Sequence, residues 1–219
     1  MKDQSDQPKD RVYHILLVCL LLVFPLHAFS SMSDAAGPRL LALGNVLTLL
    51  GCVIAMSRGH LRIVAVMLSL PTVWLVLSPE ESGTVFALSG DLFALVVYGY
   101  VIYALCRRIY SELRISAADI SAAMSIYLLM GLVWARLYGL VLQIDPEAFR
   151  GPEGLHEAHI ESALFYFSFV TLSTLGYGDI SPVGPIAMSL ATLEAIVGQL
   201  FLVVGVATVV SAATNNKAS

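Results

Sequence analysis

The stretch Thr171–Asp179 reads TLSTLGYGD, and it decides the fold of this chain. Gly176 and Gly178 alternate with larger residues in it. Because glycine adopts backbone conformations that a Cβ disfavours, this spacing lets successive carbonyl groups point the same way. The apolar residues 160–173 just before it predict a helix of about 14 residues, roughly 21 Å long, which is too short to cross a bilayer. We therefore predict a re-entrant segment, whose backbone is buried in protein or lines a water-filled path.

The whole chain is too apolar for a soluble protein. Of its 219 residues, 58% are hydrophobic and 13% are charged, and the mean hydropathy is +0.81. Soluble domains carry roughly 25% charged residues, so a soluble enzyme is excluded. The formal net charge of −4 provides no basic surface for nucleic acid. Cys19, Cys52 and Cys106 lie in apolar runs without metal-ligand spacing, so we expect neither disulfides nor a zinc site.

Six apolar stretches are long enough to span a bilayer. They are Val12–Phe29, Leu40–Ser57, Leu61–Leu77, Thr84–Cys106, Asp119–Ile144 and Pro185–Ala212. With the N-terminus inside, nine Lys and Arg residues fall in cytoplasmic segments, against Arg39 and Arg150 on the other side. Because positively charged loops stay cytoplasmic, this count predicts a multi-pass protein of the cell membrane with both termini cytoplasmic. An alternative, suggested by the small residues in 28–30, is that the first stretch is a cleaved signal peptide.

The alternating glycines suit the binding of a dehydrated K⁺ ion. Rings of backbone carbonyls replace its water shell without adding formal charge. Thr174 adds a hydroxyl to the innermost ring, and Tyr177 projects backward to brace the strand. The segment matches, at all six specified positions, the filter signature T-x-x-T-x-G-Y-G-D of the tetrameric K⁺-channel family, which the chain resembles over roughly 160–212. The filter residues that this resemblance implies are Thr174, Leu175, Gly176, Tyr177 and Gly178, with K⁺ at the first four.

The resemblance implies an all-α membrane protein with six transmembrane helices, a pore helix and a re-entrant filter loop. Four identical chains would form one fourfold pore. The implied segments are a cytoplasmic N-terminus (1–11), a four-helix peripheral domain (12–106), a cytoplasmic interfacial linker (107–118), a pore domain (119–212) and a short cytoplasmic tail (213–219). The predicted function is passive, K⁺-selective conduction by a homotetramer in contact with membrane lipids. The chain is predicted to be no enzyme and to need no cofactor beyond the bound K⁺.

The sequence departs from the family pattern at two places. The family's aromatic cuff around the filter corresponds here to Tyr166 and Phe167, and phenylalanine cannot donate a hydrogen bond to Tyr177 or Asp179. That brace is therefore expected to be missing. The fourth span, 84–106, contains no Lys or Arg, so the charges that sense voltage in related channels are absent. The first four helices are then a scaffold or a regulator.

Three charged residues inside the spans are further candidates. Arg136, Asp91 and Glu194 lie at depths that agree within about 3 Å, so opposite charges at one level can meet. Unpaired charges in a bilayer are costly, and we expect Arg136 to pair with Glu194, Asp91 or both, with Glu194 favoured. A third possibility is that Arg136 reaches upward to external water. The predicted filter-support residues are Thr171, Asp179, Tyr166, Phe167, Glu194 and Arg136.

The last span supplies the predicted inner cavity. Gly198 corresponds to the family's hinge, and close helix packing is the equal alternative for it. The cavity and gate residues implied by the family's spacing are Gln199, Leu202, Val206 and Val210. A ring of valines can gate by dewetting, and Gln199 either lines the cavity or bonds a neighbouring helix. Before the fifth span, Ser116 and Asp119 have the spacing of a helix capping box.

Three other functions remain open at this point. A weakly selective cation channel would result if the altered aromatic cuff lets the filter relax. A K⁺ transporter subunit is less favoured, because such proteins usually carry four degenerate filter loops in one chain and this chain has one. A non-conducting membrane scaffold is the third. Outside the membrane, the acidic segment 145–161 is a cation-concentrating vestibule or an ordinary loop, and His156 and His159 lie within it.

Overall fold

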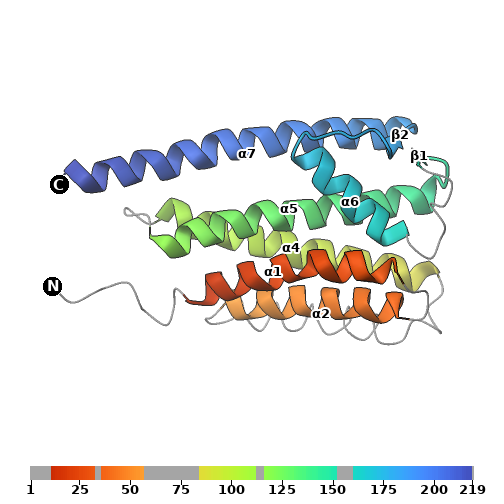
Figure 1. Cartoon of the computed structure of the whole chain (residues 1–219), viewed down its shortest axis with the longest axis horizontal. Coiled ribbons are helices and arrows are strands. Elements are labelled where there is room, and N and C mark those ends of the chain that lie inside the picture. Colours follow the sequence, from red (N-terminus) through yellow and green to blue (C-terminus); the bar gives the residue numbers. More distant parts are fainter. Residues whose placement is uncertain (1–10, 33–35, 57–83, 112–115, 152–159, 219) are drawn as a thin grey trace.

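The structure is a computed structural model that describes residues 11–32, 36–56, 84–111, 116–151 and 160–218, with backbone alone for 84–88, 110–111 and 206–218. It is almost entirely helical. Its elements, labelled as in Figure 1, are α1 (Arg11–Ser30), α2 (Gly37–Ala55), α4 (Thr84–Ser111), α5 (Ala117–Ile144), β1 (Phe149–Arg150), α6 (Ile160–Leu172), β2 (Ser181–Pro182) and α7 (Pro185–Ala218).

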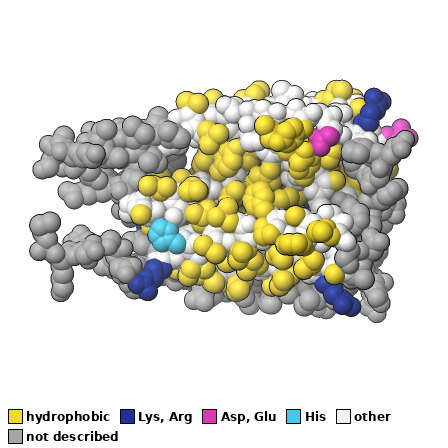
Figure 2. All heavy atoms as spheres, viewed as in Figure 1, with side chains coloured by type: hydrophobic (Ala, Val, Ile, Leu, Met, Phe, Trp, Pro, Cys, Tyr) yellow, Lys and Arg dark blue, Asp and Glu magenta, His cyan; other side chains and the backbone are white. Residues whose placement is uncertain are grey.

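Within the described residues, five helices are long and apolar enough to cross a membrane: α1, α2, α4, α5 and α7. The sixth predicted span, 61–77, lies outside the described residues. Helix α6 is shorter than the spans, as predicted for the segment before the filter. Hydrophobic side chains cover the middle of the face drawn in Figure 2, and the visible charged side chains lie toward its two ends. The protein is therefore a multi-pass membrane protein.

The long helices lie roughly side by side, and α6 crosses between α5 and α7 at an incline (Figure 1). Helix α1 contacts α2, α5 and α6, and α4 contacts α5, so the peripheral helices pack on the pore half of the same chain. The start of α1 and the end of α7 lie at one end of the molecule, and the β1–β2 pair lies at the other (Figure 1).

Small residues bring α1 and α2 close together. A Cβ added to Gly51 would lie 3.2 Å from Cδ1 of Leu16 and 3.1 Å from the Cβ of Cys19. Leu16 and Cys52 are fully buried in the same contact. In a bilayer, where lipid is as apolar as leucine, such close backbone approach is what holds helices together.

Helix α5 begins at the predicted capping box. The Ser116 side chain accepts a hydrogen bond from the backbone N–H of Asp119, and the Asp119 carboxylate accepts from the backbone N–H of Ser116. Helix α4 continues to Ser111, past the predicted end of the span at Cys106, and so carries Arg108 over the ring of Tyr13 and within 3.3 Å of Asp119. One carboxylate thus takes part in the capping box of α5 and holds α4 beside it.

Replacing Asp119 tests this double role. Asp119→Ala removes the carboxylate half of the capping box and the ion pair with Arg108, while the bond from the backbone N–H of residue 119 to the Ser116 side chain stays possible. We expect it to lower the free energy of unfolding by about 1–2 kcal/mol, within the range of a weakened helix cap. Asp119→Asn keeps a capping oxygen and should lose less. Thermal unfolding of the purified protein in detergent measures both variants. Equal losses for Ala and Asn would assign the whole effect to the charge.

Candidate functional site

The backbone turns sharply at the end of α6 and then forms the filter segment. The N–H of Thr174 donates to the carbonyl oxygen of Thr171 at 2.9 Å, and the N–H of Leu175 donates to that of Val170, also at 2.9 Å. These bonds cap the C-terminal end of α6. Thr171, predicted as a support residue, therefore acts here through its backbone carbonyl.

Every second residue of the filter segment has a positive φ. The values are 58° at Thr174, 57° at Gly176 and 79° at Gly178. A chain that alternates between positive and negative φ turns successive carbonyls toward one side, which is the arrangement that a ring of ion ligands requires. Glycine adopts positive φ freely, whereas a residue with a Cβ pays about 1–2 kcal/mol. Thr174 bears that strain at the inner end of the segment.

The outer end of the filter is held by a tyrosine. The hydroxyl of Tyr166 donates to Oδ2 of Asp179 at 2.8 Å, and its ring lies parallel to that of Tyr177 with centroids 6.5 Å apart. Phe167 makes no such bond, as predicted, but Asp179 still has a brace, because Tyr166, the other member of the aromatic pair, supplies it. Phe167 is buried away from the filter and packs edge-on against Tyr138 and Phe149.

A short antiparallel pair fixes the chain beyond the filter. Phe149 faces Pro182 and Arg150 faces Ser181 in the β1–β2 ladder. The next backbone N–H groups, those of residues 183 and 184, both donate to the carbonyl oxygen of Ala148. The segment after residue 178 is therefore tied to the chain just beyond the C-terminal end of α5.

Gly198 brings α7 against the C-terminal end of α6. A Cβ on Gly198 would overlap the carbonyl oxygen of Leu172, and the hydroxyl of Tyr127 donates to the same oxygen at 3.2 Å. Helix α7 runs through Gly198 without a break. These contacts favour the packing role of Gly198, and the hinge stays a prediction.

Glu194 lies fully buried behind the filter, among α5, α6 and α7. Its Oε2 accepts a short hydrogen bond from the hydroxyl of Tyr138, and its Oε1 lies 2.6 Å from the hydroxyl of Ser168. The carbonyl oxygen of Gly131 lies 2.8 Å from the same hydroxyl, whose single hydrogen can go to only one of these two oxygens at a time. One carboxyl group thus joins α5, α6 and α7.

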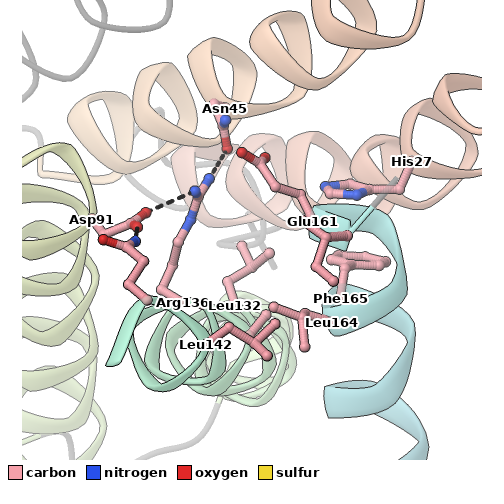
Figure 3. A pocket seen from close by; sticks show the side chains of 13 residues that line it. His27, Asn45, Asp91, Leu132, Arg136, Leu142, Glu161, Leu164 and Phe165 are labelled. Carbon is pink, nitrogen blue, oxygen red and sulfur yellow. Dashed lines mark hydrogen bonds and ion pairs between the residues drawn. The ribbon is translucent and has the colours of Figure 1, made fainter. Parts of the chain in front are cut away.

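Arg136 belongs to a different network. Its Nη1 donates to Oδ1 of Asp91 at 3.0 Å, and its Nη2 donates to the side-chain oxygen of Asn45 (Figure 3). This network borders a cavity of about 260 Å³ among α1, α2, α4, α5 and α6, into which Glu161 and His27 also point (Figure 3). The predicted Arg136–Glu194 ion pair is wrong, and Asp91, its second predicted partner, is confirmed.

The geometry of α5 explains the error. Arg136 and Tyr138 are two residues apart, so their side chains leave the helix at directions about 200° apart. Tyr138 points to Glu194 and the pore helix, which leaves Arg136 facing the peripheral helices α2 and α4. Similar predicted depths therefore do not make Arg136 and Glu194 partners, because depth does not decide which helix face a side chain occupies.

The peripheral helix α1 contacts the pore helix directly. Phe24 packs against Phe165 and Phe169 of α6 at centroid distances of 5.0 and 4.7 Å, and His27 stacks on Phe165 at 4.0 Å. The hydroxyls of Ser30 and Ser162 are 2.8 Å apart. The pore helix is thus supported on the side away from α7 as well.

Sequence reasoning missed several residues of these networks: Tyr138, Ser168, Tyr127 and Asn45. All four carry a polar group within a mostly apolar run. That pattern is the signal that could have found them, because polar groups buried in a bilayer need partners. Among the described residues no cluster of three or more His, Cys, Asp or Glu side chains could hold a metal ion.

The remaining predicted residues lie as follows. Leu175 and Tyr177 of the filter are 57% and 66% exposed in the single chain, and Gln199 and Leu202 are exposed on α7. The side chains of Val206 and Val210, and the residues His156 and His159, lie outside the described residues.

Comparison with known proteins points to ion channels. Residues 126–215 match a family model described as an ion channel. This range includes most of α5, the pore helix, the filter segment and α7 as far as residue 215. Ion channels are not enzymes, and neither is this protein.

One curated relative is the inward rectifier potassium channel Kirbac3.1 of Paramagnetospirillum magnetotacticum, which is 52% identical over 40 residues. The match covers 18% of this chain and 14% of that protein, so it concerns a short segment of each. No solved structure matches the chain.

Combined substitutions distinguish the two buried networks. Because Arg136 and Glu194 share no partner, we expect the stability losses of Arg136→Leu and Glu194→Leu to add within about 0.5 kcal/mol in the double variant. Arg136→Leu and Asp91→Leu remove the same ion pair, so their losses should deviate from additivity by roughly 0.5–3 kcal/mol. Unfolding in detergent provides the measurement. Strong coupling between Arg136 and Glu194 would contradict the observed networks.

Proposed function

We propose that this chain is a subunit of a homotetrameric, K⁺-selective channel that conducts passively through Thr174–Gly178. The observation that carries the proposal is the positive φ at Thr174, Gly176 and Gly178, in a segment that α6 delivers part-way into the membrane. Nothing in this arrangement performs covalent chemistry. Carbonyl oxygens that replace the hydration shell are what passive K⁺ conduction needs.

The exposed surfaces of the single chain support assembly of several copies. One chain supplies one filter strand, and a ring of carbonyls needs others around the same axis. Large apolar side chains of the filter and of α7 are exposed in the single chain: Leu175, Tyr177, Ile196, Leu200, Leu202, Val203 and Val204. Neighbouring copies would cover those facing the axis and the subunit contacts, and lipid would cover the rest.

We assign the β1–β2 end to the outside of the cell membrane and both termini to the cytoplasm. The distribution of Lys and Arg supports this orientation. The positions of the start of α1 and the end of α7 at one end of the molecule agree with it (Figure 1).

K⁺ selectivity, rather than weak cation selectivity, is favoured by the bond between Tyr166 and Asp179. Tyr166 supplies the hydrogen-bond donor that Phe167 lacks, and so restrains the outer end of the filter. The name of the potassium channel that matches over 40 residues is in line with this choice.

Flux measurements in liposomes test the proposal. Purified protein should pass K⁺ much faster than Na⁺ down a gradient, and external Ba²⁺ should block the flux. Equal fluxes of the two ions would favour a weakly selective channel. No flux of either ion would favour a non-conducting scaffold.

Glycine-to-alanine substitutions in the filter test which residues carry selectivity. Gly176→Ala or Gly178→Ala places a Cβ at positive φ, with a strain of about 1–3 kcal/mol per residue in each copy. We expect loss of K⁺ flux while the tetramer still forms on a sizing column. Gly139→Ala is a matched control, because a Cβ there meets no atom within 4 Å and its φ is not positive. A Gly176→Ala variant with wild-type selectivity would contradict the proposal.

Gating should depend at most weakly on voltage. Residues 84–106 of α4 contain no Lys or Arg, and their Asp91 is paired with Arg136 of α5. Moving one charge across 100 mV provides about 2.3 kcal/mol, so few free charges mean little voltage dependence. Planar bilayer recordings at a series of potentials measure it. Steep opening, equivalent to several elementary charges per subunit, would show that other charges move.

A further inference from the structure

The hydroxyl of Thr174 takes part in two hydrogen bonds at the inner end of the filter. It donates its hydrogen to the carbonyl oxygen of Ser173 at 2.7 Å, and its oxygen lies 3.1 Å from Nε2 of Gln199. Because the hydroxyl hydrogen is used on Ser173, the amide of Gln199 must be the donor in the second bond. Helix α7 therefore contacts the filter segment through the Gln199 side chain, in addition to packing through Gly198 on the C-terminal end of α6.

We infer that Gln199 is a positioning residue that sets the cation affinity of the innermost filter site. The inference rests on the proposed function. A hydroxyl oxygen has two lone pairs, and the amide N–H of Gln199 occupies one of them. The amide hydrogen carries partial positive charge and faces the same oxygen that would bind the ion. Gln199 thus orients the Thr174 hydroxyl and weakens its attraction for a cation, and every copy in the assembly repeats the effect.

Weak binding at this site suits conduction. An ion must bind well enough to enter the filter but must also leave it. Thr174 is strained at a φ of 58°, and its side chain is fixed by both neighbours rather than free to rotate. Losing the Gln199 bond frees one lone pair of the hydroxyl oxygen, so the site should hold cations more tightly.

Internal Ba²⁺ is the probe for this site. Its radius is close to that of K⁺ and its charge is doubled, so it occupies the same oxygens for longer. In planar bilayers, with Ba²⁺ on the cytoplasmic side, Gln199→Leu should tighten block by about threefold to tenfold, on the order of one neutral hydrogen bond. Gln199→Met, with an unbranched side chain of similar length, replaces the leucine variant if that variant does not assemble.

Two further variants separate this role from a merely structural one. The exchange Gln199→Leu with Leu202→Gln keeps an amide on the cavity side of α7 but moves it away from Thr174, and it should behave like Gln199→Leu. In a Thr174→Cys background, whose thiol is a poor acceptor, Gln199→Leu should leave Ba²⁺ block unchanged.

The outcomes separate this inference from the proposed function. Wild-type K⁺ conduction with Ba²⁺ block within twofold of wild type in Gln199→Leu and Gln199→Met overturns the inference and leaves the channel in place. The inference is likewise overturned if Ba²⁺ blocks the exchange variant as weakly as it blocks the wild-type protein. Absence of K⁺ conduction in the wild-type protein overturns the proposed function, and the inference with it.

Discussion

The conformation of Thr174–Gly178 is the constraint on which the pore half depends. Alternating signs of φ deprive this backbone of the partners that a helix or a sheet would provide, and the bilayer offers no water to replace them. Such a segment persists only where its surroundings overdetermine it. Its inner end is held by the end of α6 and by Gln199, and its outer end by Tyr166 and the β1–β2 pair.

Helix α5 serves two polar networks on opposite faces. Tyr138 joins Glu194 and Ser168 behind the filter, whereas Arg136 joins Asp91 and Asn45 among the peripheral helices. Tyr138, Ser168, Arg136, Asp91 and Asn45 each bond within their own network, as a low-dielectric surrounding demands. The peripheral helices therefore contact the rest of the chain in two ways. Helices α4 and α2 accept the hydrogen bonds of Arg136, and α1 packs on α6 through Phe24 and His27.

The helices and the glycine positions in 174–178 are features that the sequence alone predicts. Hydropathy and length predicted α1, α2, α4, α5 and α7 within a few residues at most ends, because a bilayer accepts little else than apolar helices of that length. The capping box at Ser116 was predictable because the bonding side chains are three residues apart. Gly176 and Gly178 were predictable places for a positive φ, because glycine adopts it without the steric cost of a Cβ.

Only the tertiary structure decided which side chains meet across helices. Counting residues from the ends of the spans predicted one depth for Arg136, Asp91 and Glu194. The rotation of α5 about its axis nevertheless separates the arginine from Glu194. The brace on Asp179 comes from Tyr166 rather than Phe167, because the tilt of α6 decides which of two adjacent rings faces the filter. The bond from Gln199 to Thr174 needs the close approach at Gly198. These contacts depend on helix rotation and tilt, which packing sets and a one-dimensional pattern does not encode.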